Sequence, residues 1–416
     1  MDVLLVGLNT NLVEIRTFIE SAGYRLVGEF LQHRPRPDPR TFLGKGKLEE
    51  LKKVVKEKSV DAVVFAGSLK PSQHHELEKA LGVQCFDRLR VILDIFTQRA
   101  HTREAKLQVE LAMLQYEVPI LKEWIHSAAA GERPGFMAGG EYRVDAYYET
   151  VKRRMTKVRR ELETVRKERA LRRDHRHERG FYHVSLAGYA NAGKSSLFNA
   201  LSGETVQVED RLFTTLSTTT RMLKEVRRRI LVTDTVGLVA DVPLWLVEAF
   251  QSTFEEVFAS DLVLLLIDVS DPPEEIDGKV RLAEATLLPG IDADRIIPVL
   301  TKTDRDSGDG IERARQRLKG SPFSRAPISV SANTGDGLEI LRNEIAQEFR
   351  YPVELTLRLP QADGKATFLN WLHDRTDVLS VSYPQNEVEV HVRCRDQDVA
   401  RIRSTARIVS GPSSST

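Results

Sequence analysis

Short apolar runs alternate with amphipathic stretches along the first part of the chain. Residues 2–7, 24–30, 61–65 and 83–86 are rich in strand-forming side chains, and the segments between them follow the helical period. Such alternation is typical of strands that alternate with helices. It predicts a small N-terminal α/β domain over residues 1–95.

The period of the apolar positions changes after residue 95. Apolar residues from 96 to 121 recur at alternating spacings of four and three, and a second stripe of the same kind covers residues 144–165. Each stripe predicts a long helix, and a heptad seam of this length needs a helical partner. Residues 127–141 between them contain too much Gly and Pro to continue either helix. We therefore expect an antiparallel helical hairpin with a glycine-rich tip over residues 96–180.

Strand-like runs alternate with helices again over residues 181–350, where HVSLA, RRILVT, DLVLLLID, RIIPVL and APISV predict a mostly parallel sheet covered by helices. Residues 351–416 predict a small βαββα domain that ends in a disordered tail. The expected fold class is a multidomain α/β protein: a small N-terminal α/β domain, the hairpin, the parallel-sheet domain and a small C-terminal α+β domain.

Composition adds little to this picture except locally. The chain has 61 Lys and Arg against 60 Asp and Glu, and two cysteines cannot build a four-cysteine zinc site. Neither a signal peptide nor a membrane span is recognisable, so we expect a cytoplasmic protein. Residues 151–180 hold thirteen basic and five acidic residues. A solvated helix face explains such a run, and so does a surface for a polyanion such as RNA.

The strongest chemical signal is the run GYANAGKS, residues 188–195, between the strand HVSLA and the helix SSLFNAL. It satisfies the phosphate-loop pattern in the required strand-loop-helix context. Glycines let successive backbone amides turn towards a β-phosphate, Lys194 can span β- and γ-oxygens, and Ser195 can bind magnesium. We expect Lys194 to be catalytic.

Two further segments follow the phosphate loop in the order that a phosphate-sensing site requires. Asp234 ends the strand RRILVT, where its carboxylate can hold magnesium, and the Gly237 amide can meet a γ-phosphate. Between them lies LFTTL, in which the Thr215 hydroxyl can reach magnesium only while a γ-phosphate is present. Taken alone, DTVG is more typical of a turn, and the threonine-rich segment is more typical of a surface strand.

Base selection is predicted to come from two later strand ends. Thr301-Lys302-Thr303-Asp304 follows RIIPVL, and a carboxylate at Asp304 can accept two hydrogens from guanine but not from adenine. Ser331-Ala332-Asn333 follows APISV and can place backbone amides against the guanine oxygen. We expect Mg²⁺ ligands at Ser195, Thr215 and Asp234, and catalytic roles for Lys194, Thr215 and Gly237. The residues expected to contact the nucleotide are Gly188, Tyr189, Ala190, Asn191, Ala192, Gly193, Lys194, Ser195, Ser196, Phe213, Thr214, Thr215, Asp234, Thr235, Val236, Gly237, Thr301, Lys302, Thr303, Asp304, Ser331, Ala332 and Asn333.

The ordered set GYANAGKS, FTTL, DTVG, TKTD and SAN resembles the motifs of a translation-factor-related GTPase, and the flanking segments resemble the HflX family. Residues 92–116, ILDIFTQRAHTREAKLQVELAMLQY, are similar to the family's helical signature, and TFLGKGKLEEL is similar to its N-terminal glycine-lysine loop. The resemblance implies a GTPase, expected to be a monomer, that binds GTP, GDP and the large ribosomal subunit through the hairpin and its basic helix. It further implies that the protein splits or rescues stalled or idle ribosomes.

The sequence also departs from the family's pattern. Thr301 stands where Asn is usual, Asn333 replaces a common Lys, and residues 138–143 differ from the usual hairpin tip. Leu238 occupies a position where many GTPases carry a water-orienting glutamine, so slow hydrolysis without a partner is expected. Asn191 lies at a loop position linked in some related GTPases to K⁺, although it could equally stabilise the loop.

Two other functions stay open at this stage. A signalling switch could use the hairpin to bind a protein, in which case the charge would serve solubility alone. An NTP-driven RNA remodeller would have to accept adenine despite Asp304.

Overall fold

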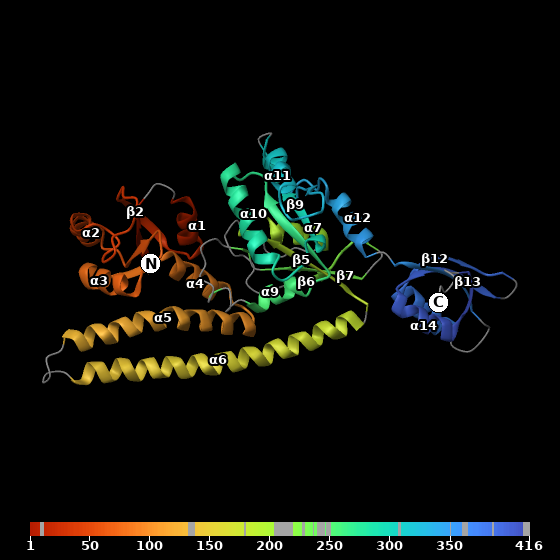
Figure 1. Ribbon diagram of the computed structural model, residues 1–416, viewed down its shortest axis with the longest axis horizontal. Helices are drawn as coiled ribbons and strands as arrows, with labels where there is room; N and C mark the ends of the chain where they lie inside the picture. Colours follow the sequence, from red (N-terminus) through yellow and green to blue (C-terminus); the bar gives the residue numbers. More distant parts are fainter. Residues whose placement is uncertain are drawn as a thin grey trace.

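The computed structural model arranges the chain as three sheet-containing units beside two long helices (Figure 1). The structure describes residues 1–8, 12–131, 138–178, 180–203, 219–226, 229–235, 237–238, 246, 251–306, 309–349, 351–359, 365–384 and 387–410. Four predicted site residues lie outside these ranges: Phe213, Thr214, Thr215 and Val236.

The N-terminal unit is a four-stranded parallel sheet with strand order β2-β1-β3-β4. Its elements are β1 (Asp2–Gly7), α1 (Val13–Ser21), β2 (Arg25–Leu31), α2 (Lys45–Lys58), β3 (Ala62–Phe65), α3 (Pro71–Leu81), β4 (Gln84–Asp87) and α4 (Arg88–Arg99). Helices α1 and α4 pack on one face and α2 and α3 on the other, so the central strands are buried on both sides. This explains why these strands consist almost entirely of apolar residues.

The hairpin consists of α5 (Arg103–Gly131) and α6 (Ala138–Glu178), which lie side by side and antiparallel below the sheets (Figure 1). Leu107 and Leu111 of α5 pack against Val158 and Leu162 of α6 in a shared apolar seam. The opposite side of α5 packs into the core of the N-terminal unit. No described helix is both long and apolar enough to cross a membrane.

Two details of the hairpin differ from the sequence prediction. The first stripe is not one helix, because α4 ends at Arg99 and Ala100 adopts an extended conformation. Thr102 then caps the N-terminus of α5: its side-chain oxygen accepts a hydrogen bond from the amide of Ala105 at 3.2 Å. The helices also extend further into the glycine-rich segment than predicted, to Gly131 and from Ala138.

A six-stranded sheet with order β10-β9-β8-β5-β7-β6 forms the third unit, and β6 is its one antiparallel member. Helices cover both faces, and the loops after the parallel strands meet at one edge, where ligands of such sheets bind. Its elements are β5 (Tyr182–Gly188), α7 (Lys194–Ser202), β6 (Thr219–Met222), β7 (Ile230–Asp234), α9 (Gln251–Phe258), β8 (Leu262–Asp268), α10 (Pro273–Leu287), η1 (Ala293–Arg295), β9 (Ile296–Thr301), η2 (Thr303–Arg305), α11 (Gly310–Lys319), β10 (Ile328–Ser329) and α12 (Leu338–Glu348).

The C-terminal unit is an antiparallel sheet with order β12-β13-β11-β14. It contains β11 (Val353–Leu359), α13 (Lys365–Arg375), β12 (Asp377–Ser382), β13 (Val388–Cys394), α14 (Asp396–Thr405) and β14 (Arg407–Ser410). The predicted βαββα pattern therefore lacked the last strand. RIVS is too short to show an alternating pattern, and its pairing with β11 fixes it as a strand.

Candidate nucleotide-binding site

The predicted phosphate loop connects β5 to α7 and requires glycine at two points. Gly188 has a φ of 150°, and a Cβ there would lie 2.7 Å from the carbonyl oxygen of Leu266 in β8. Gly193, the residue before α7, has a φ of 84°. Asn191 also adopts a left-handed conformation, with a φ of 66°, and its side chain is exposed. The loop thus presents backbone amides at the start of a helix, which favours an anion.

Lys194 lies buried at the first position of α7, and its ammonium group holds the loop. Its Nζ donates hydrogen bonds to the carbonyl oxygens of Tyr189 at 2.8 Å and Gly188 at 3.2 Å. Burial lowers the pKa of Lys194 to about 8, although the nearby carboxylate of Asp234 acts in the opposite direction. A phosphate group placed here would favour the charged form of the lysine.

This lowered pKa predicts that nucleotide affinity depends on pH. The Lys194 ammonium is charged below its pKa and neutral above it, so nucleotide binding must take up a proton at higher pH. We expect the affinity for GDP to fall from about pH 7.5 to about pH 9, with a slope of at most about tenfold per unit. Calorimetric titrations at constant ionic strength measure this dependence.

A Lys194→Arg variant is the control for this prediction, because its guanidinium stays charged over the whole range. It should bind GDP more weakly but without the slope. A flat profile in the unmodified protein would contradict the role of Lys194 as the titrating group.

Ser195 and Asp234 form the part of the site that suits a magnesium ion. The Ser195 hydroxyl donates to Oδ2 of Asp234 at 2.8 Å, and both side chains are buried at the end of β7. A carboxylate and a hydroxyl beside a phosphate-binding loop are hard oxygen ligands of the kind that Mg²⁺ prefers. The described residues contain no cluster of three or more His, Cys, Asp or Glu that could hold a metal. These two residues therefore fit an ion that takes most of its other ligands from phosphate and water, and the predicted third protein ligand, Thr215, lies outside the described residues.

Gly237 and Leu238, at the end of the DTVGL run, contact the phosphate loop. The Leu238 amide donates to the carbonyl oxygen of Gly188, and the Ala190 amide donates to the Leu238 carbonyl, both at 2.9 Å. A Cβ on Gly237 would lie 2.8 Å from Cα of Ala190 and 2.9 Å from Nζ of Lys194. Only glycine fits this approach of the Gly237 backbone to the phosphate loop.

The two predicted base-selecting segments meet as expected at the ends of β9 and β10. The Ser331 hydroxyl donates to Oδ1 of Asp304 at 2.7 Å, and the Asn333 amide donates to Oδ2 at 3.5 Å. The Ser331 hydrogen bond is the main reason that the pKa of Asp304 lies below its ordinary value. Asp304 is exposed and carries a full negative charge at neutral pH, as an acceptor of two guanine hydrogens must.

Thr301 joins the phosphate half of the site to the base half. Its buried Oγ1 donates to the carbonyl oxygens of Ala192, at 2.9 Å, and Ile267, at 3.2 Å. Although Asn is usual at this position, the threonine here connects the phosphate loop to the end of β9 through its hydroxyl group. The neighbouring Lys302 pairs with Asp268 at 2.6 Å.

Replacing Thr301 by valine should weaken the fold and the whole nucleotide site without changing base preference. The carbonyl oxygen of Ala192 would lose this donor, which costs about 1–3 kcal/mol of unfolding free energy when the group is buried. GDP and GTP affinities should fall together, while the GDP-to-ADP preference stays because Asp304 is unchanged. Urea unfolding and nucleotide titration measure both effects.

Thr286→Val is a matched control for this prediction, because the Thr286 hydroxyl also donates to a carbonyl oxygen, that of Leu282 at 2.7 Å, within α10. It should leave nucleotide affinity unchanged. A Thr301→Val protein that retains full affinity and stability would contradict the assignment.

The structure thus brings together the predicted residues of 188–196, Asp234, Thr235 and Gly237 on one side, and those of 301–304 and 331–333 on the other. Sequence reasoning missed Asp268, whose one signal is an acid at the end of a wholly apolar strand.

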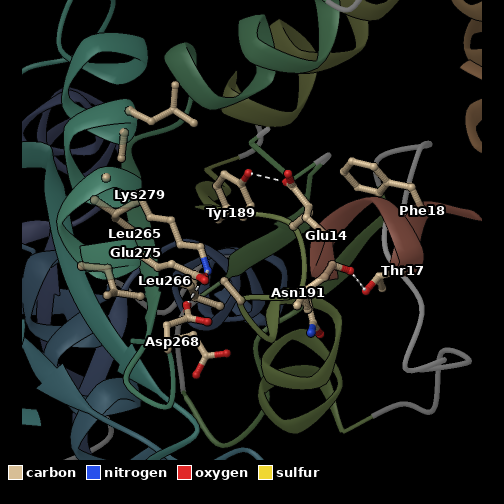
Figure 2. A pocket seen from close by; sticks show the side chains of 18 residues that line it. Glu14, Thr17, Phe18, Tyr189, Asn191, Leu265, Leu266, Asp268, Glu275 and Lys279 are labelled. Carbon is tan, nitrogen blue, oxygen red and sulfur yellow. Dashed lines mark hydrogen bonds and ion pairs between the residues drawn. The ribbon is translucent and has the colours of Figure 1, made fainter. Parts of the chain in front are cut away.

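It also missed a contact with the N-terminal unit. Figure 2 shows Tyr189, whose hydroxyl donates to Glu14 of α1 at 2.9 Å, beside a cavity of about 420 Å³ between α1 and α10. Nothing in the local sequence around either residue predicts this contact, because 175 positions separate them.

A parallel sheet with this loop, the following DTVG segment and a base-selecting strand end defines the domain as that of a P-loop GTPase. Three family models match consecutive stretches of the chain: "GTP-binding GTPase N-terminal" over residues 9–97, "GTP-binding GTPase Middle Region" over residues 99–176 and "50S ribosome-binding GTPase" over residues 183–302.

Two proteins of similar sequence show which family of GTPases this is. GTPase HflX of Thermofilum pendens is 40% identical over 395 residues, which cover 94% of this chain and 92% of that protein. GTPase HflX of Thermococcus kodakarensis is 46% identical over 305 residues, covering 73% and 69%. The chain belongs to the HflX family of GTPases. The solved complex of SsGBP with GDP has a similar fold, with a TM-score of 0.50 and 24% identity over 83% of this chain and 98% of that one.

Proposed function

We propose that this protein is a magnesium-dependent GTP hydrolase that binds the large ribosomal subunit and splits or rescues stalled or idle ribosomes according to its nucleotide. The observation that carries the proposal is the meeting of the phosphate loop, Asp234 and Asp304 at one edge of one sheet. The match of residues 183–302 to a 50S ribosome-binding GTPase family supports the ribosomal part.

Each site residue has a distinct task in the proposed reaction. Lys194 leaves the loop carbonyls for the β- and γ-oxygens, and the Gly237 amide donates to the γ-phosphate. Ser195 and Asp234 would hold Mg²⁺, and the ion would offset phosphate charge when bound. Water attacks the γ-phosphorus, the bond to the β-phosphate oxygen breaks, and GDP and inorganic phosphate form. Thr215, outside the described residues, remains the predicted third protein ligand of the ion.

We further propose that hydrolysis is slow until a partner completes the site. Leu238 is 5% exposed, is held by its backbone against Gly188, and has no side-chain group that orients water. A ribosomal surface would supply that group or move the segment. Asn191 remains the candidate for a stimulating potassium ion, which turnover in KCl and NaCl at equal ionic strength tests.

The proposed RNA-binding surface is the basic side of α6. Its exposed cations extend over about twenty residues of one helix, and a helix of that length spans about 30 Å. Neutralising several phosphates releases counterions and favours binding at low salt. Apart from Arg154, which pairs with Glu110 of α5, the exposed basic side chains of the described part of this helix are Lys152, Arg153, Lys157, Arg159, Arg160, Lys167 and Arg172.

Sedimentation with purified large subunits tests this proposal. The protein should pellet with the subunits when a non-hydrolysable GTP analogue is present and much less with GDP, because GTP and the subunit strengthen each other's binding. Binding should also weaken steeply with salt, whereas a protein partner would give a weak salt dependence. Failure to pellet with either nucleotide at low salt would contradict the ribosomal role.

A further inference from the structure

Arg169 of α6 connects the hairpin to the GTPase domain. Its Nε donates to Oε1 of Glu256 in α9 at 2.7 Å, and its Nη1 donates to Oε1 of Glu104 in α5 at 3.1 Å. The three side chains are largely buried, with exposed fractions of 18%, 4% and 17% respectively. One guanidinium therefore binds both helices of the hairpin to a helix of the six-stranded unit, at the place where α9 lies beside α5 and α6 (Figure 1).

The contacts continue from Glu256 into the sheet. Oε2 of Glu256 lies 3.6 Å from Nε2 of His183 in β5, and this nitrogen lies 2.6 Å from Oγ1 of Thr233 in β7. The Thr233 hydroxyl is in turn hydrogen-bonded to the hydroxyl of Thr220 in β6 at 2.8 Å. We call Arg169, Glu256, His183, Thr233 and Thr220 the relay.

The four members of the relay other than Arg169 belong to elements that adjoin a segment of the nucleotide site. His183 is in the strand that leads to the phosphate loop, and Thr233 directly precedes Asp234. Glu256 is on α9, which follows the DTVG segment, and Thr220 is in the strand that follows FTTL. The hairpin is thus in contact, through one continuous set of polar side chains, with the strands and helix that carry all the phosphate-sensing segments.

Because Glu256 is buried, its ion pair with Arg169 depends on the position of the hairpin. A carboxylate that is only 4% exposed needs a cation, because burying an unpaired charge is strongly unfavourable. If the hairpin swung away from the GTPase domain, Glu256 would lose the guanidinium and would have to move to another partner or to solvent. The position of α9 and the angle of the hairpin are therefore energetically linked.

We infer that Arg169 and Glu256 are positioning residues that couple the angle of the hairpin to the nucleotide held in the GTPase site. The inference rests on the proposed function in one respect, that GDP and GTP are the ligands of that site. Replacement of GDP by GTP moves α9 and β6, and the relay transmits the change to α6. A purely structural ion pair would stabilise the fold but would leave the hairpin at one angle with either nucleotide.

Distance measurements between two spin labels test the coupling in the full-length protein. We would label Arg153→Cys, exposed on α6, and Ile340→Cys, 65% exposed on α12, after replacing the buried Cys85 and Cys394 by alanine. In this background, double electron-electron resonance should give different distributions of the distance between the two labels with GDP and with a non-hydrolysable GTP analogue. Arg169→Gln should remove that difference. Glu256→Gln removes the charge of the other partner but keeps a hydrogen-bond acceptor for Arg169, so it should reduce the nucleotide-dependent difference without abolishing it.

Arg154→Gln is the matched control. Arg154 also lies on α6, and its Nη2 donates to Oε2 of Glu110 in α5 at 2.7 Å. Among the described residues this pair makes no bond to the GTPase domain, and it is more exposed than the Arg169 contacts. It should keep the nucleotide-dependent difference. Arg169→Lys, which retains a charge for Glu256, should restore part of what Arg169→Gln removes.

The outcomes separate the inference from the proposed function. Loss of the difference in Arg169→Gln, with its retention in Arg154→Gln and unchanged GDP affinity in both, supports the relay. A full difference in Arg169→Gln, or no difference in the unmodified background, overturns it even if the protein binds GDP and pellets with ribosomal subunits. Failure of the background protein to bind GDP would overturn the proposed function and the inference together.

Discussion

A Lys194→Ala protein should fold normally and hydrolyse GTP at least about a hundredfold more slowly than the unmodified protein, because the only buried cation at the described phosphate loop is removed. The fold should tolerate the change. Burial disfavours the charge of Lys194 and lowers its pKa to about 8, so relief of this desolvation cost offsets the loss of its two hydrogen bonds to the loop. Phosphate release from GTP, measured with and without large ribosomal subunits, gives the result.

Ser195→Ala is a second, independent test of the catalytic site. The variant lacks the hydroxyl that bonds to Asp234 at 2.8 Å, and its residual turnover should require more magnesium. Lys279→Ala is the matched lysine control: Lys279 lies 5.0 Å from the Tyr189 ring and pairs with Asp271, so it is close to the loop without holding it. That control should hydrolyse GTP normally. Normal turnover in both Lys194→Ala and Ser195→Ala would remove the catalytic assignment.

Asp304→Asn should change the base that the protein prefers from guanine to xanthine. The Asp304 carboxylate can accept both the N1 and N2 hydrogens of guanine, whereas an amide offers one acceptor and one donor, which suits the carbonyl of xanthine. We expect GDP affinity to fall by about a hundredfold or more, with XDP bound more tightly than GDP. Competition between GDP, XDP and ADP for the purified protein measures the exchange.

The site around Asp304 can accommodate this substitution. The Ser331 hydroxyl, now 2.7 Å from Oδ1, can donate to an amide oxygen in the same place. Asp306→Asn, two residues further on, is the control, because Asp306 accepts a hydrogen bond from the Gly310 amide at 2.9 Å and caps α11 instead. An unchanged preference for guanine in Asp304→Asn would reject its role in base selection.

The fold class was predictable because its signals are local and repeated. Strands such as LVLLLID are buried along their whole length, and the glycines at 188 and 193 mark the strand-loop-helix passage. The features that the sequence did not reveal depend on contacts in space. The end of α4 at Arg99 could not be predicted, because apolar residues continue in register beyond the break. The strand β14 is defined only by its pairing with β11.

The candidate site shows the same division. The order of the motifs predicted that Asp304 and Ser331 would meet, since both follow strands of one parallel sheet. It could not show that the Thr301 hydroxyl would donate to the carbonyl oxygen of Ala192, because that hydrogen bond depends on how closely the phosphate loop approaches β9. Nor could it identify Glu256, whose partner Arg169 lies 87 positions away.

Isothermal titration calorimetry of the purified protein with GDP, a non-hydrolysable GTP analogue and ADP, each with magnesium, tests whether the site binds guanine nucleotides selectively. We expect saturable one-to-one binding of both guanine nucleotides and none of ADP at the same concentrations. Absence of binding heat for either guanine nucleotide across several temperatures, or equal binding of ADP, would contradict it.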